Sequence, residues 1–338
     1  MATEKAKLII DSFNLMGYDV LAIGDDDLSL GKEFLLEMSR RAKFPFLSSN
    51  VIDESSGKPL FQTHLIKKMD GLRIGIFSLI APETFPNPND LRKKGLALRS
   101  PTETAQAMVK ELQPKTDMII LISHLGYPKD VELAQTVPGI HLIVGGHTGV
   151  NLPYPPIIKN SLIVQMAQKG LYGGRLDLTF NNNEPHFFNA SEKRSFESSL
   201  NQFKERVAIS DVTEVETWLQ YNIGPYSRIL HLARLYQISL PEEFIQNLRD
   251  LIASLKTQDT EKQKALRTKV KGEAEQILKQ LQDRNEFIHN LMALGEQIKD
   301  HPEIGKMVEA FRLKYPEPEK PAPPRHEVPR PQSGAPQK

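Results

Sequence analysis

The sequence predicts an α/β domain over residues 1–190, an all-α region over residues 191–315 and a disordered tail over residues 316–338. Short apolar runs, typical of buried strands, alternate with segments of helical periodicity in the first part. Beyond residue 190 the composition shifts to helix formers with apolar side chains on one face. The tail is rich in proline and lacks an apolar pattern, so it cannot bury enough surface to fold.

The α/β region is expected to begin with a helix. Apolar residues between Lys5 and Met16 fall at helical spacing, and Gly17 is the residue type that most often ends a helix. Further along, Ser100, Pro101 and Glu103 form an N-cap, a first-turn proline and a capping-box partner. The expected elements are a strand at residues 20–23, a helix at 30–44, a strand at 44–51, a hairpin at 63–81, a helix at 100–113, a strand at 117–123, a helix at 129–136, and strands at 140–146, 162–167 and 173–180.

The region from residue 191 to 315 is expected to form a helical arm with an antiparallel hairpin. Phe196, Leu200 and Phe203 share one helical face. A polar stretch at residues 256–279 continues into apolar positions as far as Leu291, which extends the predicted helix to that residue. Such an arm offers a surface to a protein partner.

Composition excludes several classes of function. The 338 residues contain 43 Lys+Arg and 42 Asp+Glu, for a net charge of +1, so there is no basic field to hold nucleic acid. There are no cysteines, which leaves histidine and carboxylates as the strong metal ligands. No apolar run approaches the roughly 20 residues that span a bilayer. The N-terminal segment shows no export signal, so the chain as written is expected in the cytoplasm.

Polar side chains follow four strands of the predicted sheet, at the edge where open α/β sheets bind ligands. Asp25 follows the first strand, Asn50 the second, and His124 and His147 the strands at 117–123 and 140–146. Taken alone, a histidine after a strand is more often a hydrogen-bonded turn residue. Two histidines and a carboxylate on one edge, with glycines that permit sharp turns, instead indicate a metal site.

Asp25, Asp26 and Asp27 form a run of like charges. Two carboxylates about 4 Å apart repel by roughly 4 kcal/mol at an effective dielectric constant near 20, so a cation or water must take up the charge. Alternatively, the run opens the following helix, whose dipole favours each carboxylate by about 0.3 to 1 kcal/mol. For Asp27 alone, this second explanation is the simpler one.

Six sequence blocks in one order resemble the metal-dependent phosphoesterase domain of the 5′-nucleotidase and UDP-sugar hydrolase group, within the calcineurin-like superfamily. The resemblance covers Lys5 to about Phe180 and implies an α/β/β/α metallophosphoesterase sandwich, two divalent ions of the Mn, Zn or Mg class, and hydrolysis of phosphate esters such as nucleotides. The blocks are GYDVLAIGDDDLSLG, FPFLSSNV, DGLRIGIFSLIAPET, ISHLG, VGGHTGV and IVQMAQKGLYGGRLDLTF.

The resemblance also implies roles for individual residues. Asp25, His124 and His147 match ligands of one metal ion. Asp26 matches a catalytic histidine that contacts the phosphate or the leaving group, although an ionised aspartate cannot donate a proton. Asn50 lies in a matched block and is a candidate substrate-binding residue.

The chain also departs from the family. The Asp-x-His and Gly-Asp motifs, which precede the first helix in the family, have no counterpart, and Gly149 replaces a second metal-binding histidine. We therefore expect an incomplete sandwich that lacks its first βα unit and has at most one well-formed metal site.

Two hypotheses follow. In one, the protein is a phosphoesterase whose first βα unit lies upstream of Met1. In the other, it is a non-catalytic, degenerate domain that retains a relic site and acts as a binding or interaction module through its arm and tail. The expected ligand in both is a phosphorylated small molecule. Localisation stays open, because the resembling enzymes are commonly exported.

Overall fold

The computed structural model describes residues 1–166, 170–208, 231–236, 238–240, 243–255, 257, 259–295 and 297–316. The helices are α1 (Ala2–Met16), α2 (Lys32–Arg41), α3 (Pro101–Leu112), α4 (Tyr127–Thr136), α5 (Ala190–Ala208), α8 (Phe244–Leu255), α9 (Thr260–Gln282) and α10 (Pro302–Lys314), with 3₁₀ turns η1 (Asp26–Leu28), η2 (Pro82–Thr84) and η3 (Leu91–Lys93). The strands are β1 (Leu21–Ala22), β2 (Phe46–Leu47), β3 (Val51–Asp53), β4 (Lys58–Pro59), β5 (His64–Met69), β6 (Leu72–Ile80), β7 (Leu96–Leu98), β8 (Met118–His124), β9 (Leu142–Gly145), β10 (Ile157–Ile158), β11 (Ser161–Gln165), β12 (Tyr172–Thr179), β13 (Phe187–Asn189) and β14 (Asn285–Ala293). None of the helices in these ranges is long and apolar enough to cross a membrane.

Two helix boundaries follow the local signals in the sequence. Helix α1 ends where Gly17 adopts a left-handed conformation, with φ 72°, and its N–H bonds to the Phe13 carbonyl. Helix α3 begins at Pro101, and the Ser100 hydroxyl accepts a hydrogen bond from the Glu103 N–H at 3.3 Å. Both predicted boundaries are confirmed.

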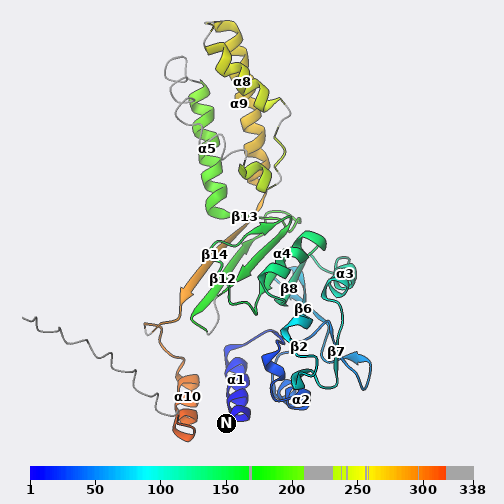
Figure 1. The fold of residues 1–338 in the computed structure, drawn as a ribbon. Helices are drawn as coiled ribbons and strands as arrows, with labels where there is room; N and C mark the ends of the chain where they lie inside the picture. The colour runs from blue at the N-terminus through cyan, green and yellow to red at the C-terminus, as the bar shows by residue number, and fades with distance from the viewer. Residues whose placement is uncertain are drawn as a thin grey trace, which may run out of the picture.

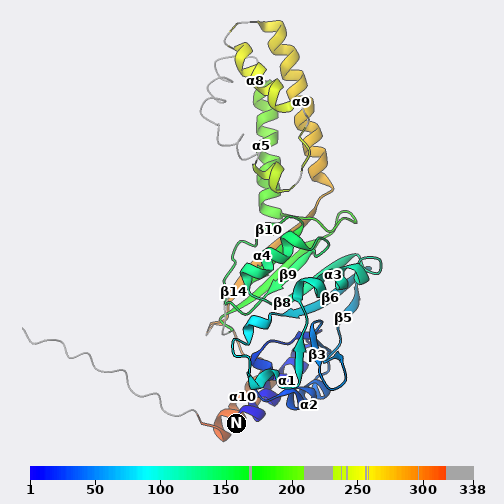
Figure 2. The same cartoon turned by 45° about the vertical axis from the view of Figure 1, so that its right-hand side comes forward.

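The largest sheet has six strands in the order β10-β11-β9-β8-β6-β5. Strands β6, β8, β9 and β11 are parallel, and the predicted hairpin at Asp70 and Gly71 joins β5 to β6. Helices α3 and α4 pack on one face, over buried residues that include Phe77, Leu121 and Ile143 (Figure 2). The parallel order places the carboxyl ends of β8 and β9 at one edge.

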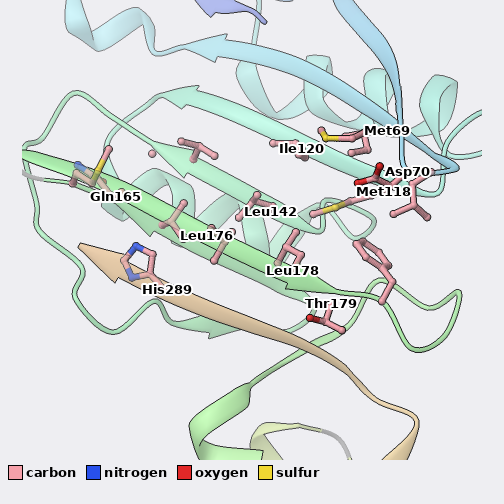
Figure 3. Close-up of a pocket in the computed structure, with 18 residues that line it drawn as sticks. Met69, Asp70, Met118, Ile120, Leu142, Gln165, Leu176, Leu178, Thr179 and His289 are labelled. Atoms are coloured by element: carbon pink, nitrogen blue, oxygen red, sulfur yellow. The ribbon is translucent and has the colours of Figure 1, made fainter. Parts of the chain in front are cut away.

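A second sheet, in the order β12-β14-β13, lies across the other face of the first (Figure 1). Between the two sheets is a cavity of about 780 Å³ (Figure 3). Leu142, Leu176 and Leu178 point into it from opposite sheets, Gln165 and His289 lie toward one end, and Met69 and Asp70 lie toward the other. The described side chains therefore fill the space between the sheets only in part, which costs packing energy.

Residues 285–293 form a strand, although the sequence pattern predicts that the arm helix continues to Leu291. Strand β14 pairs antiparallel with β12, and with β13 in parallel. Alternate residues of β14 face inward, but two of these, Asn285 and His289, are polar, so the apolar pattern does not show the twofold period. Asn285 is 0 % exposed, and its side-chain oxygen accepts the N–H groups of Asn181 and Asn182. Pairing with β12 therefore overrides the helical pattern in the sequence.

Helices α5, α8 and α9 form an arm that projects from the second sheet (Figure 1). Helices α8 and α9 are antiparallel, because Asn247 contacts Glu273 while Ser254 contacts Gln263. Apart from Phe188, the buried cluster inside the arm comes from residues 196–281. The division of the chain at residue 190 stays a prediction, and most of the tail at 316–338 lies outside the described residues.

His141 makes a structural hydrogen bond just before β9. Its Nδ1 accepts a hydrogen bond from the Ile119 N–H at 2.8 Å. Burial, and to a lesser degree the neighbouring His186, lowers the pKa of His141 from 6.5 to about 4. Between pH 6.5 and about pH 4, the folded protein therefore keeps the His141 ring neutral, whereas the same ring in the unfolded chain binds a proton.

This pKa difference makes stability depend on pH. The contribution of neutral His141 is complete above pH 6.5 and is lost as the pH falls toward 4. We expect the free energy of unfolding, from urea titrations in EDTA, to fall over this range. The fall should be smaller for His141→Asn, whose amide oxygen can still accept the Ile119 N–H. Equal losses in the two proteins would contradict the assignment.

Candidate metal centre

The structure brings the three predicted ligands together at one sheet edge. Asp25 lies where the chain turns from β1 into η1, His124 is the last residue of β8, and His147 follows β9 by two residues. One ligand atom from each residue lies within 4.8 Å of the others. Because β8 and β9 are parallel neighbours, their two histidines meet at this edge.

The ligand atoms gather around one carboxylate oxygen. His124 Nε2 lies 2.8 Å from Asp25 Oδ1, and His147 Nδ1 lies 4.0 Å from the same oxygen. The two imidazole rings have centroids 4.9 Å apart. Two imidazole nitrogens and a carboxylate oxygen suit a zinc-type or manganese-type ion. The Asp25 side chain is 13 % exposed and that of His147 37 %, so the cluster opens to solvent on one side.

Local backbone geometry permits this close approach. A Cβ atom at Gly24 would lie 2.8 Å from His124 Cε1, so only glycine fits without moving the ring. His147 itself has φ 73°, a left-handed conformation that is uncommon for a residue with a side chain. Such strain concentrates at functional sites. Both features support a site built around these two histidines.

Arg92 belongs to the cluster, although no motif in the sequence marked it. Its Nη1 donates a hydrogen bond of 2.5 Å to Asp25 Oδ2, and its Nη2 bonds to Asp90 and to the Thr84 carbonyl. Burial alone would raise the pKa of Asp25, but hydrogen bonds from His124 and Arg92 outweigh it, and the pKa is lowered. Asp25 is therefore held in the ionised form that binds metal.

The other two aspartates of the run lie apart from the ligand atoms. The Asp26 side chain is 97 % exposed, and its nearest charged partner is Arg92 Nη1 at 3.4 Å. Asp27 Oδ2 accepts the Gly24 N–H at 2.7 Å. Although Asp27 is exposed as a residue, its carboxyl group turns back toward the chain, where desolvation raises its pKa. The run thus divides into one candidate ligand, one solvated side chain and one side chain that bonds back to the chain at Gly24.

Asn50 is 0 % exposed, and within the described residues its side chain bonds to backbone groups. Its amide nitrogen donates to the Ile80 carbonyl at 2.8 Å and to the Arg99 carbonyl at 3.1 Å, and its oxygen accepts the Ile80 N–H at 3.0 Å. These bonds join the loop after β2 to the end of β6. They favour a structural role for Asn50 over the predicted contact with substrate.

Within the described part of the chain, no second group of three such ligands lies close enough to form another site. The expectation of at most one well-formed site stays a prediction, because it concerns the whole chain and not these ranges alone.

Comparisons with known proteins support the resemblance noted in the sequence. No protein-family model matches the chain. A 5′-nucleotidase of Vibrio cholerae is 32 % identical over 200 residues, which cover 50 % of this chain and 36 % of that protein. Protein UshA of Escherichia coli is 31 % identical over 207 residues, 52 % of this chain and 38 % of its own length. The chain thus spans less than two fifths of the length of these relatives.

The solved structure of a 5′-nucleotidase precursor from Thermus thermophilus is 30 % identical, with a TM-score of 0.47, and the match covers 54 % of this chain and 39 % of that one. The sequence matches therefore carry the assignment. Over the matched half, this chain is a homologue of proteins named 5′-nucleotidase and UshA.

Proposed function

We propose that the protein binds one divalent metal ion through Asp25, His124 and His147 and hydrolyses phosphate esters at this site. The observation that supports the proposal most directly is the convergence of the three ligand atoms within 4.8 Å. The convergence lies in a segment whose relatives are named 5′-nucleotidases. Calcineurin-like phosphoesterases use divalent metals, and the donor set found here fits such an ion.

The contacts of the residues in the cluster suggest what each of them does in metal binding. His124 and His147 offer ring nitrogens, and Asp25 offers Oδ1 while Arg92 holds Oδ2 and fixes the plane of the carboxylate. A bound divalent ion supplies a Lewis acid that polarises a phosphoryl oxygen. Asp26, whose side chain is 97 % exposed, places a carboxyl group where the resemblance has a histidine, and a carboxyl group is a poor general acid for a departing alkoxide. We therefore expect the protein to prefer esters with acidic leaving groups.

The second candidate function is a binding domain without turnover. The exposed carboxylate of Asp26 favours it, because Asp26 occupies the position that the resemblance gives to a catalytic histidine. In this case the metal ion holds a phosphorylated small molecule, such as a nucleotide, and the helical arm contacts a protein partner.

Hydrolysis assays separate the two functions. The protein is stripped with EDTA, reloaded with Mn²⁺ or Zn²⁺, and assayed with bis-p-nitrophenyl phosphate, p-nitrophenyl phosphate and AMP. We expect metal-dependent turnover of the p-nitrophenyl esters, slower turnover of AMP, and loss of all activity in His124→Ala. The matched control is His301→Ala, at the exposed start of α10.

The same assays also show when the proposal fails. Metal-dependent binding of AMP with no hydrolysis of any ester would establish the second function. A protein that binds neither metal ion would overturn both.

A further inference from the structure

Buried polar side chains lie behind the metal ligands, on the ends of three neighbouring strands. The sheet register places Ser123 of β8, Gly145 of β9 and Gln165 of β11 side by side. Asp130 of α4 covers them and is itself 0 % exposed. Its Oδ1 accepts a hydrogen bond from the Ser123 hydroxyl. None of these side chains is among the site residues predicted from the sequence.

The two ends of this polar cluster contact the residues beside the histidines. Ser123 precedes His124, and its hydroxyl oxygen accepts the Leu125 N–H at 3.1 Å. Thr148 follows His147, and its hydroxyl oxygen accepts the Tyr127 N–H at 3.2 Å. The polar cluster thus reaches the backbone on both sides of the metal centre.

Gln165 extends the cluster toward His147, because its side chain lies 3.3 Å from the Thr148 hydroxyl. None of these hydrogen bonds joins Asp130 to Gln165, which face each other in the middle of the cluster.

Two buried oxygens in that middle position have no hydrogen-bond partner among the residues that the structure describes, namely Asp130 Oδ2 and Gln165 Oε1. Gln165 is 2 % exposed, so neither oxygen can turn to bulk water at low cost. A Cβ atom on Gly145 would lie 2.7 Å from the first oxygen and 3.0 Å from the second. Both oxygens therefore lie close to the position that a Cβ atom of residue 145 would occupy. They fit there because residue 145 is glycine.

We propose that Asp130 and Gln165 hydrogen-bond directly to each other across Gly145, and that these two positioning residues tie the His124 loop to the His147 loop. A neutral Asp130 carboxyl group donates to Gln165 Oε1. An ionised one accepts from the Gln165 amide after a half-turn of the amide, whose oxygen then accepts the Thr148 hydroxyl. Either arrangement satisfies both oxygens.

Burial raises the pKa of Asp130 to about 7, although its bond from Ser123 acts in the opposite direction. Both forms of the carboxyl group are thus accessible near neutral pH, and the direct contact survives in each. The link to metal binding rests on the proposed function, whereas the contact itself does not.

A reciprocal exchange of the two side chains tests the contact. Asp130→Asn keeps a donor toward Gln165 Oε1 and an acceptor for Ser123. Gln165→Glu places two carboxyl groups face to face, and the double variant restores an amide and a carboxylate in exchanged positions. Gln135→Glu, at an exposed site on the same helix, controls for the added charge.

The first readout is urea unfolding in EDTA. We expect Gln165→Glu alone to reduce the folding equilibrium constant about tenfold, and to have little effect in the Asp130→Asn background. Equal effects in both backgrounds would show that the side chains do not touch and would overturn the proposal. If Gln165→Glu does not fold, recovery of folding in the double variant supports the contact, and failure to recover overturns it.

The second readout is the placement of the histidines. In the metal-free protein, the ring proton resonances of His124 and His147 should shift in Gln165→Glu and return in the double variant. Zn²⁺ affinity should fall by about 10- to 100-fold and recover likewise. Unchanged histidine resonances in Gln165→Glu would overturn the positioning role. If the wild-type protein binds no Zn²⁺, the proposed function fails, while the resonances and the unfolding cycle still decide this inference.

Discussion

Replacing Gly24 with alanine is expected to weaken Zn²⁺ or Mn²⁺ binding by about 10- to 100-fold, although no ligand is removed. The new methyl group would lie 2.8 Å from His124 Cε1 and 3.1 Å from Nε2, so the ring must leave the position in which Nε2 lies 2.8 Å from Asp25 Oδ1. Isothermal titration calorimetry on the EDTA-stripped protein measures the change. The loss should approach that of His124→Ala, since both changes remove the same nitrogen from the cluster.

Gly272→Ala provides the matched control for this prediction. Gly272 lies within α9, where an added Cβ atom would meet no other described atom within 4 Å, and alanine favours helix over glycine. This variant should bind metal like the wild type and be slightly more stable. Unchanged affinity in Gly24→Ala would mean that His124 does not bind the ion in the arrangement seen here.

Replacing Asn50 with alanine is expected to lower the free energy of unfolding by about 3 kcal/mol, because the change leaves the buried backbone N–H and carbonyl of Ile80 without their side-chain partner and also removes the bond to the Arg99 carbonyl. Urea titration measures this loss. Metal affinity and the affinity for AMP should remain as in the wild type at temperatures where the variant is folded.

The exposed Asn290→Ala on β14 is the control for the Asn50 prediction, and it should change stability little. A variant of Asn50 that keeps full stability but no longer binds AMP would restore the substrate-binding role expected from the sequence.

Local signals explain which parts of the fold the sequence could predict. The αL glycine after α1 and the serine cap of α3 act within a few residues, so their chemistry is readable in the chain itself. The meeting of His124 and His147 was predictable for a different reason. Parallel neighbours end at one edge whatever their side chains are.

Long-range contacts explain what the sequence could not predict. Arg92 reaches Asp25 from a segment without apolar periodicity, 67 positions along the chain. Strand β14 depends on β12, more than a hundred residues earlier, and polar inward positions conceal its period. The role of Asn50 in substrate binding stays a prediction, because the sequence does not reveal the backbone groups of neighbouring segments to which its side chain bonds.

The arm leaves the second sheet after β13 and returns to it in β14, and these two strands are immediate neighbours. Lys193 at its base pairs with Glu286 at 2.6 Å, while its apolar interior is largely its own. The arm is a topological insertion, because the strand order of the second sheet does not depend on it. A single genetic event between codons 189 and 285 can therefore add, exchange or delete it as a cassette, and the lineage of the arm need not be the lineage of the domain that carries it.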